Sequence, residues 1–329
     1  MKTSTQSSAS GGDKLRNTGS GTEFAGAAEA VLWSRIDIAI RRRALQDLFV
    51  ERAPTTALAE LIDKIRSDRE ALSEPTCVLV TGGSGVGKST FLRHYAARYS
   101  SRREAGCLVQ PVIYEELQSK TTILAAAKVL LRKLEDPGGG RGNLADLTYR
   151  VTHQIRAQRV EVVLIDEFNH IVETGDITVN KVADWFKQVA KATNVPFVMA
   201  GMPTAARVIQ GHEQFAGITP YRYTLDQFDW SSRRGRTAFR EFLARVDLAL
   251  PFDGMAGLAD KEWAEALFSA TDGRMRPLMR QIKQAAIHAL ARGSANVGQI
   301  DLAFGYEQIE PSDPTADNPF GPYDRQRAA

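Results

Sequence analysis

The sequence has few cysteines, little net charge and no long apolar run. Its 329 residues include two cysteines, Cys77 and Cys107, whose separation fits no metal-ligand pattern. So few cysteines favour a reducing compartment over a disulfide scaffold. No apolar stretch approaches the roughly 18 residues of a membrane-spanning helix, and the Ser/Thr/Gly-rich N-terminus lacks the apolar segment of a signal peptide. We therefore expect a cytoplasmic protein without a membrane partner, and the net charge of +3 does not by itself indicate nucleic-acid binding.

A glycine-rich motif stands out against this composition. The segment 82–89, GGSGVGKS, matches the P-loop pattern G-x-x-x-x-G-K-[ST]. An apolar stretch at 77–81 predicts a buried strand before it, and apolar residues at helical spacing predict a helix over 89–100 after it. This strand and helix argue against the alternative, a glycine-rich turn that only resembles the motif.

The motif predicts a site for ATP and Mg²⁺. Glycines allow the backbone to fold around a phosphate with its N–H groups inward, and the helix N-terminus adds partial positive charge. Lys88 is expected to reach the β- and γ-phosphates, and Ser89 to ligate Mg²⁺. The expected nucleotide-binding residues are Gly82, Gly83, Ser84, Gly85, Val86, Gly87, Lys88, Ser89 and Thr90.

A second motif supplies acidic residues. Four apolar residues, 162–165, precede Asp166 and Glu167, as in a central parallel strand whose carboxyl end meets the ligand edge of the sheet. We expect Asp166 to hold Mg²⁺, through water, and Glu167 to orient and polarise the attacking water. The alternative is an acidic strand end without a role. A glutamate after the aspartate favours NTP hydrolysis over phosphoryl transfer to a small molecule.

Strand and helix patterns alternate through the centre of the chain, with apolar strands expected at 108–114, 195–201 and 221–225. This alternation predicts an α/β fold, a P-loop αβα core whose parallel sheet is covered on both faces. From Trp230 onward only helical patterns remain. The expected division is a disordered tail at 1–22, a helical lead-in at 23–71, the nucleotide-binding core at 72–229, a helical lid at 230–310 and a disordered tail at 311–329.

A P-loop core followed by a small helical lid resembles the AAA+ ATPases. In detail the chain looks most similar to the TniB/TnsC group, the ATP-dependent target-selection subunits of bacterial transposons, which are related in role to MuB. The resemblance covers roughly residues 24–305. It is carried by the lead-in helices, PVIY at 111–114, LIDEFNH at 164–170, GHEQFA at 211–216 and TDGRMR at 271–276.

The resemblance implies further roles. Arg276 occupies the sensor 2 position, which would reach the γ-phosphate from the lid; the alternative is a surface arginine, with Arg274 as the fallback. Two features depart from the family. No polar sensor 1 residue ends the strand at 197–201, where Thr204 is the nearest hydroxyl. Gly217 and Ile218 stand where the family tends to have an Asn-Arg pair, so Arg222 becomes the arginine-finger candidate. Hydrolysis is therefore expected to be slow or to need a partner.

The resemblance also implies double-stranded DNA as a partner, bound by the loop after the second strand within a ring or helical filament of protomers. In this loop Lys120 and Thr121 are the expected contacts, with Gln118 as a further donor. The alternative is that Thr121 caps the next helix and Lys120 is solvated. A second basic cluster, 233–236, is expected to face solvent or a subunit interface. No base-reading motif is visible, so binding should tolerate any sequence.

Three functions follow. The first is an ATPase that oligomerises on DNA and directs a transposase to its target. The second is a nucleotide-gated switch that acts on protein partners without DNA. The third, a small-molecule kinase, is disfavoured by the lid motif at 271–276 and by Glu167.

Overall fold

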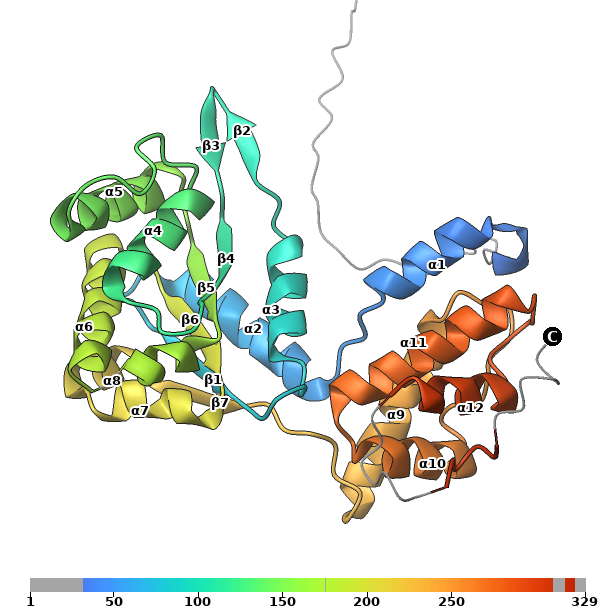
Figure 1. The fold of residues 1–329 in the computed structure, drawn as a ribbon. Helices are drawn as coiled ribbons and strands as arrows, with labels where there is room; N and C mark the ends of the chain where they lie inside the picture. Colours follow the sequence, from blue (N-terminus) through green and yellow to red (C-terminus); the bar gives the residue numbers. More distant parts are fainter. Residues whose placement is uncertain (1–31, 175, 310–316, 323–329) are drawn as a thin grey trace, which may run out of the picture.

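The structure, a computed structural model, describes residues 32–174, 176–309 and 317–322. The tail expected at 1–22 lies outside these residues. Within them, a central parallel sheet carries helices on both faces, and a group of helices lies beside it (Figure 1).

The central sheet has five parallel strands in the order β4-β5-β6-β1-β7, which confirms the expected α/β architecture. Because β1 is flanked by β6 and β7, two later strands, the P-loop leaves the sheet between neighbours that are distant in sequence. This crossover places the P-loop at a topological switch point, where ligands of open α/β sheets bind. The strands are β1 (Val78–Thr81), β4 (Val112–Glu116), β5 (Val162–Asp166), β6 (Phe197–Gly201) and β7 (Tyr221–Thr224).

Side chains alternate between the two faces of this sheet. Val78 and Val80 of β1 pack in one buried cluster with residues of α2 and α3, whereas Leu79 packs in another with residues of α4, α5 and α6. Since both faces are covered, the strands consist of near-continuous apolar residues. The covering helices are α2 (Ala53–Asp68), α3 (Lys88–Ala97), α4 (Ile123–Lys133), α5 (Leu144–Ala157), α6 (Asp176–Thr193), α7 (Ala206–Gln210) and α8 (Glu213–Ile218).

The expected strand at 108–114 is divided in two. Pro111 has no N–H for a ladder bond, and it separates β3 (Cys107–Val109) from β4. β3 pairs instead with β2 (Arg102–Glu104) in an antiparallel hairpin that projects from the sheet (Figure 1). Ala105 and Gly106 turn this hairpin with positive φ angles of 48° and 85°.

The last helices form a third buried cluster. They are α9 (Arg233–Ala249), α10 (Lys261–Thr271), α11 (Met275–Ala291) and α12 (Gln299–Glu307). Leu45 of α1 (Ile38–Asp47) belongs to this cluster, while α2 packs on the sheet. The two helices that the sequence groups in one lead-in thus pack on different parts of the molecule (Figure 1).

Part of the expected disordered C-terminal tail is ordered. Phe320 is 2% exposed and stacks on Trp263 of α10, with ring centroids 5.8 Å apart. Gln299 of α12 donates to the carbonyl of Phe320 at 3.0 Å. A single aromatic side chain that enters the helical cluster thus anchors residues 317–322, so this part of the expectation was wrong.

Among the described residues, no helix combines the length and the apolar character needed to cross a bilayer.

Candidate active site

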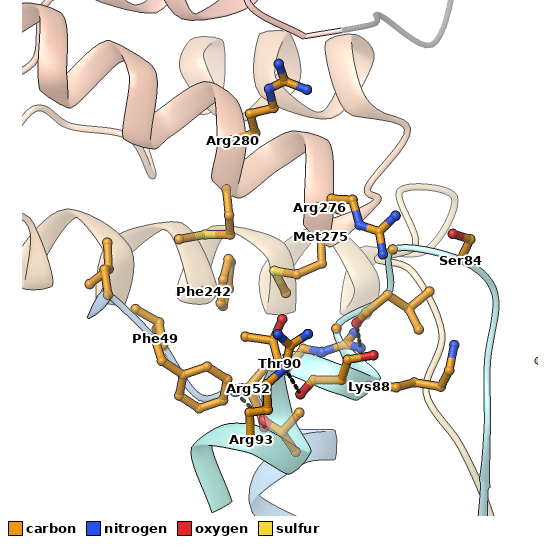
Figure 2. Close-up of a pocket in the computed structure, with 18 of the residues that line it drawn as sticks. Phe49, Arg52, Ser84, Lys88, Thr90, Arg93, Phe242, Met275, Arg276 and Arg280 are labelled. Carbon is orange, nitrogen blue, oxygen red and sulfur yellow. Dashed lines mark hydrogen bonds between the residues drawn. The ribbon is translucent and has the colours of Figure 1, made fainter. Parts of the chain in front are cut away.

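A cavity of about 300 Å³ lies where three parts of the chain meet. The loop between β1 and α3 forms one wall, the segment before α2 a second, and α11 a third (Figure 2). The lining residues include seven of the nine expected nucleotide-binding residues, Ser84 to Thr90, together with Glu167 and Arg276. The structure therefore brings together residues that the sequence places almost 200 positions apart.

Glycines give the P-loop its path. A Cβ on Gly82 would lie 2.3 Å from the carbonyl oxygen of Leu225, so the loop passes directly against the segment after β7. Gly85 and Gly87 have φ angles of +76° and +102°, which side-chain-bearing residues rarely adopt. Gly87 is the N-cap of α3 in the left-handed conformation, so α3 begins at Lys88 facing the cavity.

Lys88 is a buried cation whose hydrogen-bond partners are neutral backbone carbonyls. The residue is 7% exposed, and its ammonium group donates to the carbonyl oxygens of Gly82 and Gly83 at 2.8 and 2.9 Å. Burial lowers the pKa of Lys88, and the charges of Glu167 and Asp166 oppose this effect. A desolvated cation with neutral acceptors gains more from an anion than a hydrated one does. The arrangement suits a phosphate group.

Asp166, the last residue of β5, has no exposed surface. Its carboxylate accepts hydrogen bonds from the backbone N–H of Glu167 and from the hydroxyl of Tyr114, both at 3.0 Å. Burial, followed by the charge of Asp166, raises the pKa of Tyr114, so the phenol is the donor. Sequence reasoning placed Tyr114 in the 111–114 stretch that carries the resemblance but gave its side chain no role.

Glu167 has a φ angle of +53°, unusual for a residue with a long side chain, and it lines the cavity. Such backbone strain costs on the order of 1–3 kcal/mol and persists where the surrounding structure enforces it. The turn at Glu167 separates the two acidic side chains: Asp166 is buried in the sheet edge while Glu167 faces the cavity.

The donor set fits Mg²⁺. Ser89 lines the cavity at the start of α3. Asp166 does not line it: the residue is buried on the α3 face of the sheet, next to Glu167, which does line the cavity. A hydroxyl and a carboxylate are the hard oxygen ligands that Mg²⁺ prefers alongside phosphate oxygens. In the described residues no group of three His, Cys, Asp or Glu side chains is placed to hold a metal ion by itself.

The helical part closes the cavity through α11. The backbone N–H of Arg276 donates to the carbonyl of Gly85 at 2.9 Å, and Met275 lies against Gly87. Arg276 is exposed and its side chain lines the cavity, followed one turn later by Arg280 (Figure 2). The guanidinium of Arg274 instead donates to the carbonyl of Thr271 at 3.2 Å. Of the two arginines that the sequence singles out, Arg276 faces the cavity.

The other end of the cavity is apolar, which sequence reasoning missed. Phe49 stacks on His94 of α3 with ring centroids 4.0 Å apart. A flat apolar ligand group would fit beside such rings and thioethers. Besides Val86 and Met202, the apolar lining residues are Leu48, Phe49, Val50, Phe242, Met275 and Met279.

Arg52 is a second missed residue. It is 7% exposed, and it donates to the carbonyls of Asp226 at 2.6 Å and Val86 at 3.0 Å. Its guanidinium lies over the ring of Phe228, 5.4 Å from the centroid. Arg52 thus joins the P-loop to the segment that leads from β7 into the helices. Its only sequence signal, a position just before a helix, is too weak to reveal this role.

The remaining expected residues lie outside the cavity. Thr121 is 4% exposed and its hydroxyl donates to the carbonyl of Gln118. Because Thr121 is turned inward, we no longer expect it to contact DNA. Thr122, rather than Thr121, caps α4 by accepting from the N–H of Ala125 at 3.2 Å. Lys120 is exposed, with a φ angle of +56°, on the loop after β4.

Arg222 is exposed on β7 and does not line the cavity of its own chain. At the sensor 1 position Met202 lines the cavity, whereas Thr204 does not. Asn169 accepts from the N–H of Met202 at 2.8 Å, and a Cβ on Gly201 would lie 2.7 Å from the same amide oxygen. An asparagine from the segment after Glu167 therefore fixes the end of β6.

Comparisons with known proteins identify a family and a fold. A family model described as "Bacterial TniB protein" matches residues 43–218, more than half of the 329 residues. A comparison with curated proteins finds no match.

Several solved structures share the fold. The ORC2 protein of Aeropyrum pernix in ADPNP-ADP complexes superposes with a TM-score of 0.61 at 15% identity, covering 83% of this chain and 72% of that chain. Cdc6p of Pyrobaculum aerophilum gives 0.56 at 14% identity, covering 81% and 70%. The ORC1 protein of A. pernix in complex with DNA gives 0.55 at 16% identity, covering 82% and 69%. At these identities the likeness shows the fold, that of the AAA+ P-loop NTPases.

Proposed function

The chain belongs to the TniB family of bacterial proteins, and we propose that it is an AAA+ ATPase that assembles on double-stranded DNA and directs a transposase to its target. One observation carries the nucleotide-dependent part of this proposal. The P-loop and the start of α11 meet across one cavity, where the N–H of Arg276 bonds to the carbonyl of Gly85. A ligand in this cavity would touch both the sheet domain and the helices. A nucleotide with a γ-phosphate and one without it would therefore favour different relative positions of these two parts.

The residues suit ATP with Mg²⁺. The backbone N–H groups from Ser84 to Ser89 and the Lys88 ammonium would bind the phosphates, while the apolar end near Phe49 would take the adenine. Ser89 and, through water, Asp166 would hold Mg²⁺, which supplies charge neutralisation to the phosphates when bound. The A. pernix ORC2 structure, which shares the fold, is described with ADPNP and ADP.

Hydrolysis would use three further side chains. Glu167 would orient the attacking water and accept its proton from within the cavity. Arg276 would stabilise charge on the γ-phosphate from the same chain. Arg222 of a neighbouring copy would supply a second arginine. In other NTPases such an arginine raises the rate by a factor of about 10³–10⁵. Because Arg222 does not line the cavity of its own chain, turnover by an isolated protomer would be slow.

The DNA part of the proposal rests on the family and on one loop. The A. pernix ORC1 structure, which has the same fold, is in complex with DNA. Here Lys120 is exposed in a turn of the loop after β4 and would neutralise one phosphate per protomer. A ring or filament of identical protomers would sum such contacts. We retain the transposase as the partner and the cytoplasm as the location, as well as the division into lead-in (23–71), core (72–229) and lid (230–310).

One observation favours a second function, a nucleotide-gated switch that acts on proteins without DNA. Two acidic residues, Glu115 and Glu116, lie at the end of β4, just before the loop that holds Lys120. Their charge opposes phosphate binding. DNA binding therefore separates the two functions.

The experiment measures fluorescence anisotropy of a labelled duplex with and without a slowly hydrolysed ATP analogue. We expect cooperative binding that needs the analogue, weakens steeply with salt and is similar on unrelated duplexes. Lys88→Ala should weaken ATP binding at least tenfold, about 1.4 kcal/mol, and abolish the effect of the analogue. Lys64→Ala, which removes an exposed lysine paired with Asp68 on α2, should behave as the wild type. ATP binding without nucleotide-dependent DNA binding at low salt would favour the protein switch.

A further inference from the structure

The carboxylate of Asp166 is held from the neighbouring strand. Tyr114 lies on β4 and pairs in register with Leu164, while Asp166 pairs with Glu116 two residues further along. Positions 114 and 164 and positions 116 and 166 therefore share one face of the sheet. The Tyr114 side chain reaches along this face, and its hydroxyl donates to Oδ2 of Asp166 at 3.0 Å.

The backbone around this contact is fixed at both ends. Leu117, just after β4, donates its N–H to the carbonyl oxygen of Asp166 at 3.0 Å. Glu167 donates its N–H to Oδ1 of Asp166, also at 3.0 Å. With the main chain anchored and Oδ1 engaged by a backbone donor, the phenol of Tyr114 is the side-chain group that orients Oδ2.

Asp166 is completely buried, so the orientation of its carboxylate depends on its protein partners. A buried carboxylate cannot be reoriented by bulk water, so the groups that donate to it decide which lone pairs remain for another ligand. Partners that orient a metal-binding carboxylate in this way typically change metal affinity or activity by 10–100-fold when they are removed.

We propose that Tyr114 is the positioning residue for the metal-binding carboxylate of this site. Its hydroxyl holds Oδ2 of Asp166 in place, so that the remaining lone pairs of the carboxylate would be available to the Mg²⁺ that accompanies a bound nucleotide. This inference rests on the proposed function, because it presumes that Asp166 serves Mg²⁺ and ATP. It makes a strand residue to which the sequence assigned no role a determinant of the affinity for Mg²⁺.

The test is Tyr114→Phe, which keeps the ring and removes only the hydroxyl. Binding of a fluorescent ATP analogue is followed during a Mg²⁺ titration, and binding of a fluorescent ADP is measured in EDTA. We expect the half-saturating Mg²⁺ concentration to rise about tenfold or more, with the affinity for ADP in EDTA equal to that of the wild type. Tyr99→Phe is the matched control, since the Tyr99 hydroxyl also donates to a carboxylate, Asp63, at 2.8 Å. This variant should need the same Mg²⁺ concentration as the wild type.

The outcomes separate the inference from the function beneath it. A Tyr114→Phe protein with the wild-type half-saturating Mg²⁺ concentration overturns the inference and leaves the proposed function standing. A wild-type protein that binds neither nucleotide overturns the proposed function, and the inference with it. If Tyr114→Phe lowers the affinity for ADP in EDTA as much as for Mg-ATP, the hydroxyl supports the pocket as a whole and positioning of Asp166 is rejected.

Discussion

The backbone N–H of Arg276, at the start of α11, donates to the carbonyl oxygen of Gly85 in the P-loop at 2.9 Å. This bond joins the helical part to the glycine loop through main-chain atoms alone. The Arg276 side chain takes no part in this hydrogen bond; it lies beside Gly85 and lines the cavity, where it can act on a ligand.

Replacing Arg276 by alanine should accordingly spare the contact between the two parts and change nucleotide discrimination. Arg276→Ala keeps its backbone bond to Gly85 but loses a charge-assisted contact to the γ-phosphate, worth about 1.5–3 kcal/mol. We expect affinity for a slowly hydrolysed ATP analogue to fall roughly tenfold or more, while affinity for ADP changes little. Calorimetry with both nucleotides measures this. Arg274→Ala is the control, because that guanidinium bonds to Thr271; equal losses of ATP and ADP affinity in Arg276→Ala contradict the assignment.

Two adjacent glycines should respond differently to alanine. A Cβ at Gly82 would lie 2.3 Å from the backbone oxygen of Leu225, whereas a Cβ at Gly83 meets only the Val86 side chain at 3.9 Å. Gly82→Ala should therefore lower the free energy of unfolding by about 1–3 kcal/mol, and Gly83→Ala should stay within about 0.5 kcal/mol of the wild type. Urea denaturation of both variants decides this. A loss in Gly82→Ala no larger than that in Gly83→Ala would show that the close approach at residue 82 does not set the stability of the loop.

The strained backbone of Glu167 predicts a variant that separates stability from activity. Asparagine adopts positive φ more readily than glutamate does, so Glu167→Asn should keep the free energy of unfolding or raise it by up to about 1 kcal/mol. The same variant should lose ATP hydrolysis, because the side chain that activates water is gone. Glu167→Gln, which keeps the side-chain length, should lose hydrolysis without the gain in stability. Wild-type turnover in either variant would place water activation elsewhere.

His94 should make stability sensitive to acid. Burial lowers its pKa below the ordinary value, with Glu51 opposing and Arg98 assisting. The folded protein then binds this proton less readily than the unfolded chain, so the stabilising contribution is complete above about pH 6.5 and is lost as the pH falls through the folded-state pKa. His94→Phe keeps a ring against Phe49 and removes the titration.

The measurement is the melting temperature of the nucleotide-free protein between pH 7.5 and pH 5. The decrease in melting temperature toward low pH should be smaller for His94→Phe than for His153→Phe, a control in which an exposed histidine that stacks on Tyr149 is replaced. An equal decrease in both variants would show that other groups cause the acid sensitivity.

The sequence predicted the parts of the site that depend on local chemistry. Residues 82–89 require glycine and lysine at fixed spacing to surround a phosphate. An apolar strand that ends in an acidic residue, as at Asp166, is typical of the sheet edge beside such a loop. Apolar periodicity located the strands and the main helices, and the family resemblance pointed to Arg276.

Other features depend on contacts between distant segments, which a local pattern does not encode. Tyr114, Arg52 and Phe320 act through partners far away in the sequence, at Asp166, Val86 and Trp263 respectively. The division of the strand at Pro111 was readable from the missing N–H of proline. The inward orientation of the Thr121 side chain could not be predicted from the sequence, because either of two adjacent threonines could cap α4.

The loop after β4 offers the last prediction. With Thr121 turned inward, Lys120 is the cation exposed on the segment between β4 and α4. Lys120→Ala should weaken binding to unrelated duplexes by a similar factor and reduce the slope of log affinity against log salt by about one, because one phosphate contact per protomer is lost. ATP affinity should not change, since Lys120 lies outside the cavity.

The control is Lys261→Ala, which removes an exposed lysine at the start of α10 and so tests the effect of losing one surface charge. Fluorescence anisotropy of a labelled duplex across a salt series gives the DNA affinity and the salt slope of the wild type, Lys120→Ala and Lys261→Ala. A Lys120→Ala protein with the wild-type salt slope would move the DNA contact to another surface, and Arg233 and Arg234, exposed at the start of α9, would be replaced next.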